Sequence, residues 1–177
     1  MSNMQGDSAV AEVARRIRRS IAVGEDLYGM KFFETFEHRN EKADDLPRVY
    51  IVDYSDREVA GGGAPATGNG IDSVLRVDVT LSLQLVCDRR NGWLSSHAEA
   101  GVRKMGALSV RNLLIDTIER DDDGNVDCSL DGKVDSPPGW TTRESGIFDL
   151  GIVMDIGLSL QGHRIHRGER ACLNATP

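Results

Sequence analysis

Apolar and polar residues alternate strictly along two long stretches of the chain, and one helical stretch lies between them. Successive side chains of a β-strand point to opposite faces, so each stretch predicts a strand with one apolar and one polar face. The apolar positions are Leu75, Val77, Val79, Leu81, Leu83, Leu85 and Cys87 in the first stretch, and Phe148, Leu150, Ile152, Met154, Ile156, Leu158 and Leu160 in the second. At roughly 3.3 Å per residue, 75–87 would span about 43 Å, about twice the usual strand length. Such strands predict a sheet that can contribute to an assembly larger than one chain.

The N-terminal region has apolar residues at helical spacing, which predicts an amphipathic helix over 8–22. Asp7 or Ser8 can cap its start, and Gly24 can end it. Four arginines flank the apolar stripe: Arg15, Arg16, Arg18 and Arg19. We interpret them as a solvated face rather than as a contact with DNA.

The region that follows predicts two strands and two loops. Residues 28–38 are rich in phenylalanine, which favours a strand over a helical turn. A polar loop, 40–45, leads to a second strand over 48–54, which is rich in Val, Ile and Tyr. The glycine-rich run 55–72 predicts a mobile loop. It is not a phosphate-binding loop, because it lacks the Gly-Lys-Ser/Thr ending and leads into a strand rather than a helix.

A central helix is predicted over 96–118, where Ser96 and Glu99 have the spacing of a capping box. Its apolar residues lie on two sides, and a helix that is apolar on two sides is usually buried on two sides. One side holds Ala98, Val102, Met105 and Leu113, and the other holds Ala107, Val110, Leu114 and Ile118. The second set is our candidate subunit interface. The alternative is that the N-terminal helix of the same chain covers it.

Residues 119–146 are polar and rich in turn residues, which predicts a hairpin with short strands near 126–130 and 140–143. Periodicity is lost after residue 162. The predicted organisation is therefore one α+β domain over 1–162, with 119–146 as a hairpin insertion and 163–177 as a flexible tail. The sheet is expected to be mixed and mostly antiparallel, packed by the N-terminal and central helices.

Composition limits the function. Aromatic residues make up 5% of the 177, and the net charge is −7, which argues against sequence-independent binding of nucleic acid. The three cysteines, Cys87, Cys128 and Cys172, form neither a disulfide framework nor a zinc motif. No apolar segment is long enough for a membrane span or a signal peptide. These features predict a soluble intracellular protein.

Three groups of residues are candidate sites of chemistry. The run Asp121, Asp123 and Asn125 starts like a calcium loop, but Val126 and Gly132 occupy positions that need Gly and Glu. His163, His166 and Cys172 lack a fourth metal ligand. Asp78, Asp149 and Asp155 could form a carboxylate cluster for acid–base chemistry, although they alternate with small polar residues and are expected to face solvent. We predict no catalytic, metal or cofactor site.

The order of predicted elements resembles the tail terminator proteins of long-tailed bacteriophages, of the siphophage and myophage type. The resemblance is carried by the segments AEVARRIRRSI, PRVYIVDY, VLRVDVTLSLQLVCD, SSHAEAGVRKMGALSVRNLLID and GIFDLGIVMDIGLSLQG, within 8–162. It is a resemblance of pattern and order, without a signature motif. It implies a structural virion protein with no catalysis and no cofactor.

That resemblance implies a ring, typically hexameric, that caps the tail tube and stops its polymerisation. The implied partners are other copies of the chain, the tail tube protein and the head-side neck or connector protein, with DNA only in transit and no membrane. The implied location is the virion tail or neck, and the host cytoplasm during assembly. Asp78, Asp149 and Asp155 would then face the lumen. The alternatives are a tail-tube or head-completion protein, a monomeric adaptor, and a small cytoplasmic enzyme that uses the Asp cluster.

Overall fold

The structure is a computed structural model that describes residues 6–34, 45–59, 73–94, 101–147 and 151–166. Its elements, in chain order, are α1 (Gly6–Ser20), β1 (Lys31–Phe33), β2 (Arg48–Val59), β3 (Ser73–Asp88), η2 (Arg89–Asn91), η4 (Val102–Lys104), α2 (Ala107–Ile118), β4 (Gly139–Ile147) and β5 (Gly151–His166). The strands form one sheet in the order β1-β2-β3-β5-β4. Only β1 and β2 pair in parallel among the described strands. The predicted α+β class with a mostly antiparallel sheet is confirmed.

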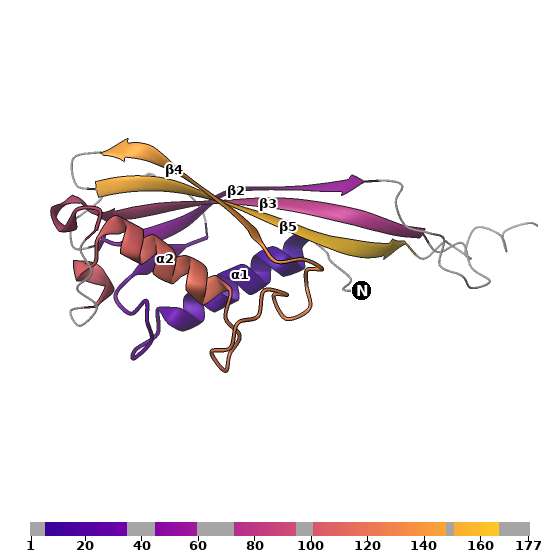
Figure 1. The fold of residues 1–177 in the computed structure, drawn as a ribbon, viewed down its shortest axis with the longest axis horizontal. Helices are drawn as coiled ribbons and strands as arrows, with labels where there is room; N and C mark the ends of the chain where they lie inside the picture. Colours follow the sequence, from indigo (N-terminus) through magenta and orange to yellow (C-terminus); the bar gives the residue numbers. More distant parts are fainter. Residues whose placement is uncertain (1–5, 35–44, 60–72, 95–100, 148–150, 167–177) are drawn as a thin grey trace, which may run out of the picture.

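The two alternating stretches form the two central strands. β3 and β5 each have 16 residues and pair without interruption from Ser73↔His166 to Asp88↔Gly151. Strict alternation favours this pairing because a slip of one residue would move every apolar side chain to the opposite face. The two strands therefore form the centre of the sheet and extend, with β2, past the helices at one end (Figure 1).

Both helices lie on the same face of the sheet (Figure 1). The core between helices and sheet contains Ala9, Val13 and Ile17 of α1, Val110, Leu114 and Ile118 of α2, and the apolar residues of β3 and β5. Each fully buried Leu or Ile removes enough apolar surface from water to contribute roughly 1.5–3 kcal/mol. The opposite face of the sheet carries no helix among the described residues, and we call it the open face (Figure 1).

Several predicted boundaries are wrong. The predicted strand over 28–38 is reduced to β1, with turn residues at 27–29, and residues 35–38 lie outside the described part. β2 continues to Val59, so 55–59 belong to a strand rather than to the glycine-rich loop, whose remainder is also not described. β5 continues to His166, so the first residues of the predicted tail, 163–166, belong to the sheet.

The predicted central helix begins about ten residues too early. α2 starts at Ala107, and Gly101 and Gly106 flank a short 3₁₀ turn, η4. Gly101 has φ +77°, a backbone conformation that residues with a Cβ rarely adopt and that an α-helix does not contain. The helix therefore cannot include this position. The predicted capping box at Ser96 and Glu99 lies outside the described residues.

The predicted hairpin over 119–146 is also wrong. Residues 140–143 belong to β4, which pairs with β5 in the main sheet. The 126–130 segment is a series of turns with a single bridge from Val126 to Arg120. Residues 119–138 instead form an irregular excursion that places Leu130 and Val134 in the core. The excursion is therefore part of the domain's packing rather than an appended insertion.

Candidate functional site

The open face of the sheet is the first candidate surface, and its composition follows from the strand register. Directly paired residues of neighbouring strands lie on the same face of a sheet. A row of such residues across the strands, which we call a register line, therefore identifies the residues of the open face. One line contains Asp53, Ser82, Gly157 and Thr141, and the next contains Ser55, Thr80, Ser159 and Gly139. The middle of the open face therefore consists of hydroxyl groups, glycines and a single carboxylate.

A small apolar cluster lies at one end of the open face. Leu46, Tyr50, Val86 and Val153 are buried there, and the Phe33 ring stacks on Tyr50 with 5.1 Å between ring centroids. A Cβ on Gly151 would come within 2.6 Å of Val86, so only glycine permits this close approach. The cluster contrasts with the two polar register lines in the middle of the same face.

The structure places two of the three candidate lumen residues on the open face. Asp155 lies beside Gln84, whose side-chain amide donates to Asp155 Oδ1 at 3.2 Å, and it also accepts from Ser145. Asp78 forms an ion pair with Arg76 at 2.7 Å. Asp149 lies outside the described residues.

The two described carboxylates do not form a cluster. In the register of β3 with β5, Asp78 lies opposite Gln161, and Asp155 lies opposite Gln84. Gln84 is six residues further along β3 than Asp78. That spacing corresponds to roughly 20 Å along the strand. Asp78 and Asp155 therefore cannot act together as a catalytic pair, and the Asp-cluster interpretation is wrong for these two residues.

The candidate subunit interface on α2 is not a surface. Ala107, Val110, Leu114 and Ile118 each have 0% exposure within the single chain. They pack in the same core cluster as Ala9, Val13 and Ile17 of α1. The alternative, in which the N-terminal helix covers this stripe, is therefore correct, and the stripe offers nothing to a neighbouring subunit.

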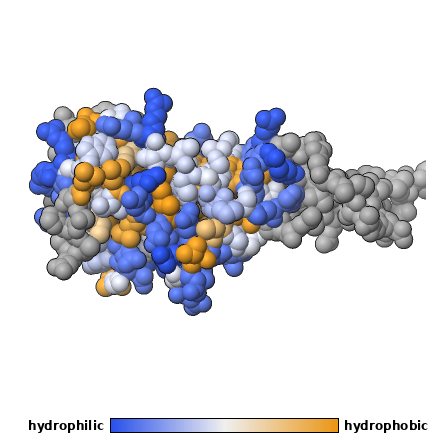
Figure 2. All heavy atoms as spheres, viewed as in Figure 1, coloured by the Kyte–Doolittle hydropathy of each residue, from blue (hydrophilic) through white to orange (hydrophobic). Residues whose placement is uncertain are grey.

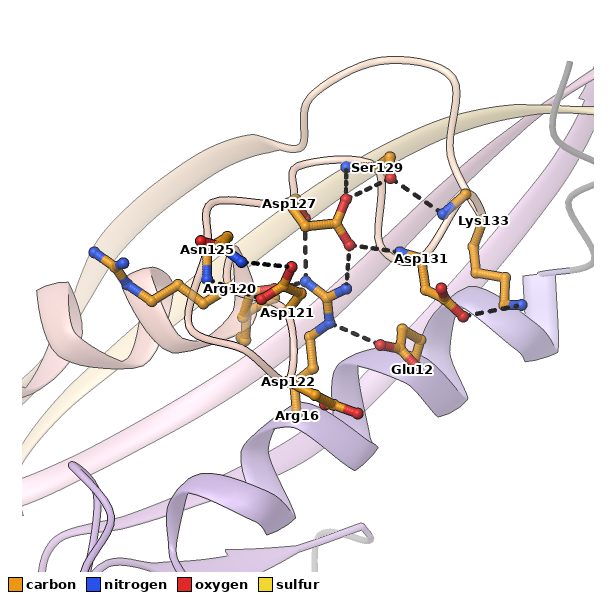
Figure 3. Close-up of polar contacts among 12 residues, drawn as sticks. Glu12, Arg16, Arg120, Asp121, Asp122, Asn125, Asp127, Ser129, Asp131 and Lys133 are labelled. Atoms are coloured by element: carbon orange, nitrogen blue, oxygen red, sulfur yellow. Dashed lines mark hydrogen bonds and ion pairs between the residues drawn. The ribbon is translucent and has the colours of Figure 1, made fainter.

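An ionic network joins α1 to the excursion, and its centre is Arg16 (Figure 3). The Arg16 guanidinium has 0% exposure and donates to Glu12 Oε1 at 2.7 Å and Asp127 Oδ2 at 2.6 Å. It also donates to the main-chain oxygens of Ile118 at 2.9 Å and Asp127 at 3.1 Å. One side chain thereby connects α1, the end of α2 and the excursion.

The surrounding charges extend this network to the surface. Arg15 and Arg19 both pair with Asp122, and Arg15 also pairs with Glu12 at 2.7 Å. Asp121 accepts from the main-chain N–H groups of Asp123 and Asn125 at 3.0 and 2.8 Å. The residues that resembled the start of a calcium loop therefore shape a turn within the protein (Figure 3).

The carboxylates around Arg16 are held in their charged form. Burial raises the pKa of Asp127, but hydrogen bonds from Ser129, from the Asp131 main chain and from Arg16 lower it by more, so it lies well below its ordinary value. Burial likewise raises the pKa of Glu12, and hydrogen bonds from Arg15 and Arg16 reverse this to a net decrease. Glu12 and Asp127 are thus both ionised throughout the neutral range.

Sequence reasoning missed Arg16, which it assigned to a solvated face. The signal is positional: Arg16 lies three residues after Val13 and next to Ile17, inside the buried stripe of α1. Glu12, four residues earlier on the helix, is the partner that compensates the buried charge. Position relative to the stripe predicts burial here better than residue type does.

The remaining candidates for chemistry have structural partners or lie outside the described residues. His163 pairs with Asp135, and the His166 side chain and Cys172 are not described. Burial raises the pKa of the Cys87 thiol to about 12, so it is not a nucleophile at neutral pH. Within the described ranges, no three His, Cys, Asp or Glu side chains are grouped closely enough to hold a metal ion.

Comparison of the sequence with models of known families finds no family that matches, and comparison with curated proteins finds no similar sequence. Neither helix in the described part of the chain is long and apolar enough to cross a membrane. Exposed hydrophobic residues, including Leu94, Leu108 and Ile147, are scattered among hydrophilic ones, and Figure 2 shows this mixed character on one side of the molecule.

Proposed function

We propose that this protein is a structural subunit of a phage tail: a ring-forming terminator that caps the tail tube, stops its polymerisation and joins it to the head-side connector. The observation that carries the proposal is the open face of the sheet. The middle of that face is polar over the width of four strands, from β2 to β4, and lacks the apolar residues that a face covered within the domain would need. The order of the elements, which resembles that family, supports the same proposal.

The chemistry of the open face suits a surface past which DNA moves. DNA is retained by basic groups, because binding to phosphates releases condensed counterions. Here hydroxyl groups and glycines occupy the middle of the face, and the arginines beside it lie next to carboxylates. Arg76 forms an ion pair with Asp78, Arg57 lies opposite Asp78, and Arg143 lies opposite Asp155. With a chain charge of −7, a ring lined by such faces would repel DNA weakly rather than bind it.

The fold also suits a mechanical role. β3 and β5 pair over 16 residues, and both helices pack on one side of the sheet. The Arg16 network fixes the excursion to that helical layer. A subunit in this role needs one rigid layer for shape and one free layer for contact, and it needs no reaction centre.

The test is the mass of the purified protein by light scattering, first alone and then with tail tubes that lack a terminator. The expected result is a ring-sized mass, or binding at one end of each tube by electron microscopy, together with an arrest of tube growth. A protein that stays monomeric and does not bind tubes would overturn the proposal and favour the adaptor interpretation. Binding along the whole tube, or incorporation into it, would favour a tube protein.

A further inference from the structure

The outer edge of β4 is unpaired within the described part of the chain. β4 forms one end of the sheet, and no strand of the described part of the chain pairs with its outer side. Residues 141–145 are all exposed. An unpaired edge presents main-chain N–H and C=O groups with which a strand of another chain can pair. A bulge at Ser145 interrupts the regular pairing with β5, which leaves six regular residues, 139–144.

The opposite side of the sheet offers a second open edge. β1 pairs only with 48–50, and beyond that point no other described strand pairs with the outer side of β2. A bulge lies between Ile51 and Asp53, after which seven residues, 53–59, pair regularly with β3. The two open edges therefore have nearly equal lengths.

The two edges carry opposite charge. The 53–59 segment contains three carboxylates and one guanidinium: Asp53, Asp56, Glu58 and Arg57. The 139–144 segment contains Arg143 and Glu144, and Arg111 of α2 reaches it by donating to Thr142 Oγ1 at 2.9 Å. The net charge is thus −2 on the β2 edge and +1 on the β4 edge, which favours contact between unlike edges over contact between like ones.

Strand direction allows these edges to join. β2, β3, β5 and β4 alternate in direction, so β2 and β4 run antiparallel to one another. A second subunit that continues the sheet would place its β2 antiparallel to β4 of the first, with the helices of both on the same side. Such a contact is heterologous, and it closes into a ring when the rotation between subunits divides a full turn.

We propose that a second copy of this chain binds through its β2 edge, residues 53–59, to the β4 edge, residues 139–144, by antiparallel strand addition. The inference rests on the proposed ring-forming function and identifies the contact that builds the ring. Because β1 occupies the outer side of β2 at 48–50, this pairing has to start at Asp53. In the antiparallel register that pairs 139–143 with 53–57, Arg143 lies directly opposite the partner's Asp53, and both residues belong to the open face.

The experiment is a charge swap, read out as the dissociation constant of self-association by sedimentation over a wide concentration range. Arg143→Glu and Asp53→Arg should each weaken association by about ten-fold or more, because each places like charges together. The double variant R143E/D53R should restore most of the lost affinity. Lys104→Glu, a charge reversal on the exposed η4 outside both edges, is the matched control and should have no effect.

Milder variants guard against a folding defect. Arg143→Gln and Asp53→Asn should weaken association by less. Thermal unfolding of the Asp53 variants should match that of the natural protein, because Asp53 is exposed and lies opposite Ser82. Arg143 is exposed but lies opposite Asp155 of its own chain, so Arg143→Glu should unfold at a slightly lower temperature and Arg143→Gln should not. A natural protein that is monomeric at all concentrations would overturn the inference. So would single variants that assemble normally, or a double variant that remains as dissociated as the singles.

Failure of this inference can be distinguished from failure of the proposed function. If the protein forms rings that bind tube ends, and the charge-swap variants assemble as well as the natural protein does, the strand-addition contact is excluded. The terminator proposal would still hold. A chain that assembles through the swapped charges, but does not bind tube ends, would keep the contact and exclude the terminator role.

Discussion

The two faces of the sheet are built by the same strands and have opposite roles. On β3, Leu81, Leu83 and Leu85 are at most 1% exposed beneath the helices, whereas Thr80, Ser82 and Gln84 lie between them on the other face. The covered face supplies the apolar burial that stabilises the domain. The open face contributes little to that burial, so its residues are available for the contacts between subunits and the passage of DNA that we propose. Alternation along one strand therefore separates the residues that stabilise this domain from those that its proposed function uses.

The largest expected effect comes from a charge on the covered side. Leu114→Asp should abolish the folded state, because an unpaired carboxylate at a fully buried site costs more than about 4–5 kcal/mol, the range of exceptional substitutions. The matched control is Leu108→Asp on the exposed side of the same helix, which should remain folded. Circular dichroism and solubility measure both. A Leu114→Asp variant that stays folded but no longer assembles would show that the α2 stripe is a subunit interface.

The next effect sharpens the contrast between buried and exposed arginines of one helix. Arg16→Met should cost about 3–5 kcal/mol in the free energy of unfolding, because it removes a fully buried guanidinium. Asp127 would lose its arginine partner, Glu12 would keep Arg15 alone, and the main-chain oxygen of Ile118 would lose its donor from Arg16. Arg15→Met should cost about 1 kcal/mol or less, since Arg15 is 45% exposed and its ion pairs are screened by water. Urea denaturation measures the difference, and equal costs would show that the network does not depend on Arg16.

Much of the covered face could be predicted from the sequence, and little of the excursion could. Strict alternation gave β3 correctly to within two residues at either end, since period and burial coincide there. The end of β2, residues 55–59, was missed because Asp56 and Glu58 have low strand propensity, and cross-strand pairing with β3 outweighs that propensity.

The candidate site was predictable only where it follows from alternation. The polar positions of the open face, including Asp78 and Asp155, could be assigned from the period alone. The Arg16 network could not, because Asp127 lies 111 residues from Arg16 and no local pattern joins them. The two open edges also depend on strand order, which the sequence does not specify.

A smaller effect is expected on the stability of the fold at low pH. The pKa of Asp127 is lowered in the folded state, so its charge stabilises the fold above the unfolded-state value near 4. That stability is lost as the pH falls from about 5 through the lower folded-state pKa. Asp127→Asn should cost about 1–3 kcal/mol at pH 7, and its cost should shrink as the pH falls. Unfolding free energies measured from pH 7 to pH 3 test this. A cost that does not change with pH would show that the charge of Asp127 is not what matters.

The smallest effect on stability is expected on the open face. Thr80→Lys should change the free energy of unfolding by less than about 0.5 kcal/mol, because Thr80 is exposed and packs against no helix. It should nevertheless confer salt-dependent binding to double-stranded DNA on the assembled protein, because each new phosphate contact steepens the dependence on salt by about one unit. Thr80→Gln is the uncharged control and should not bind. Measurable, salt-dependent binding by the natural protein would contradict a face past which DNA slides. A Thr80→Lys variant that unfolds easily would show instead that the open face is covered in the monomer.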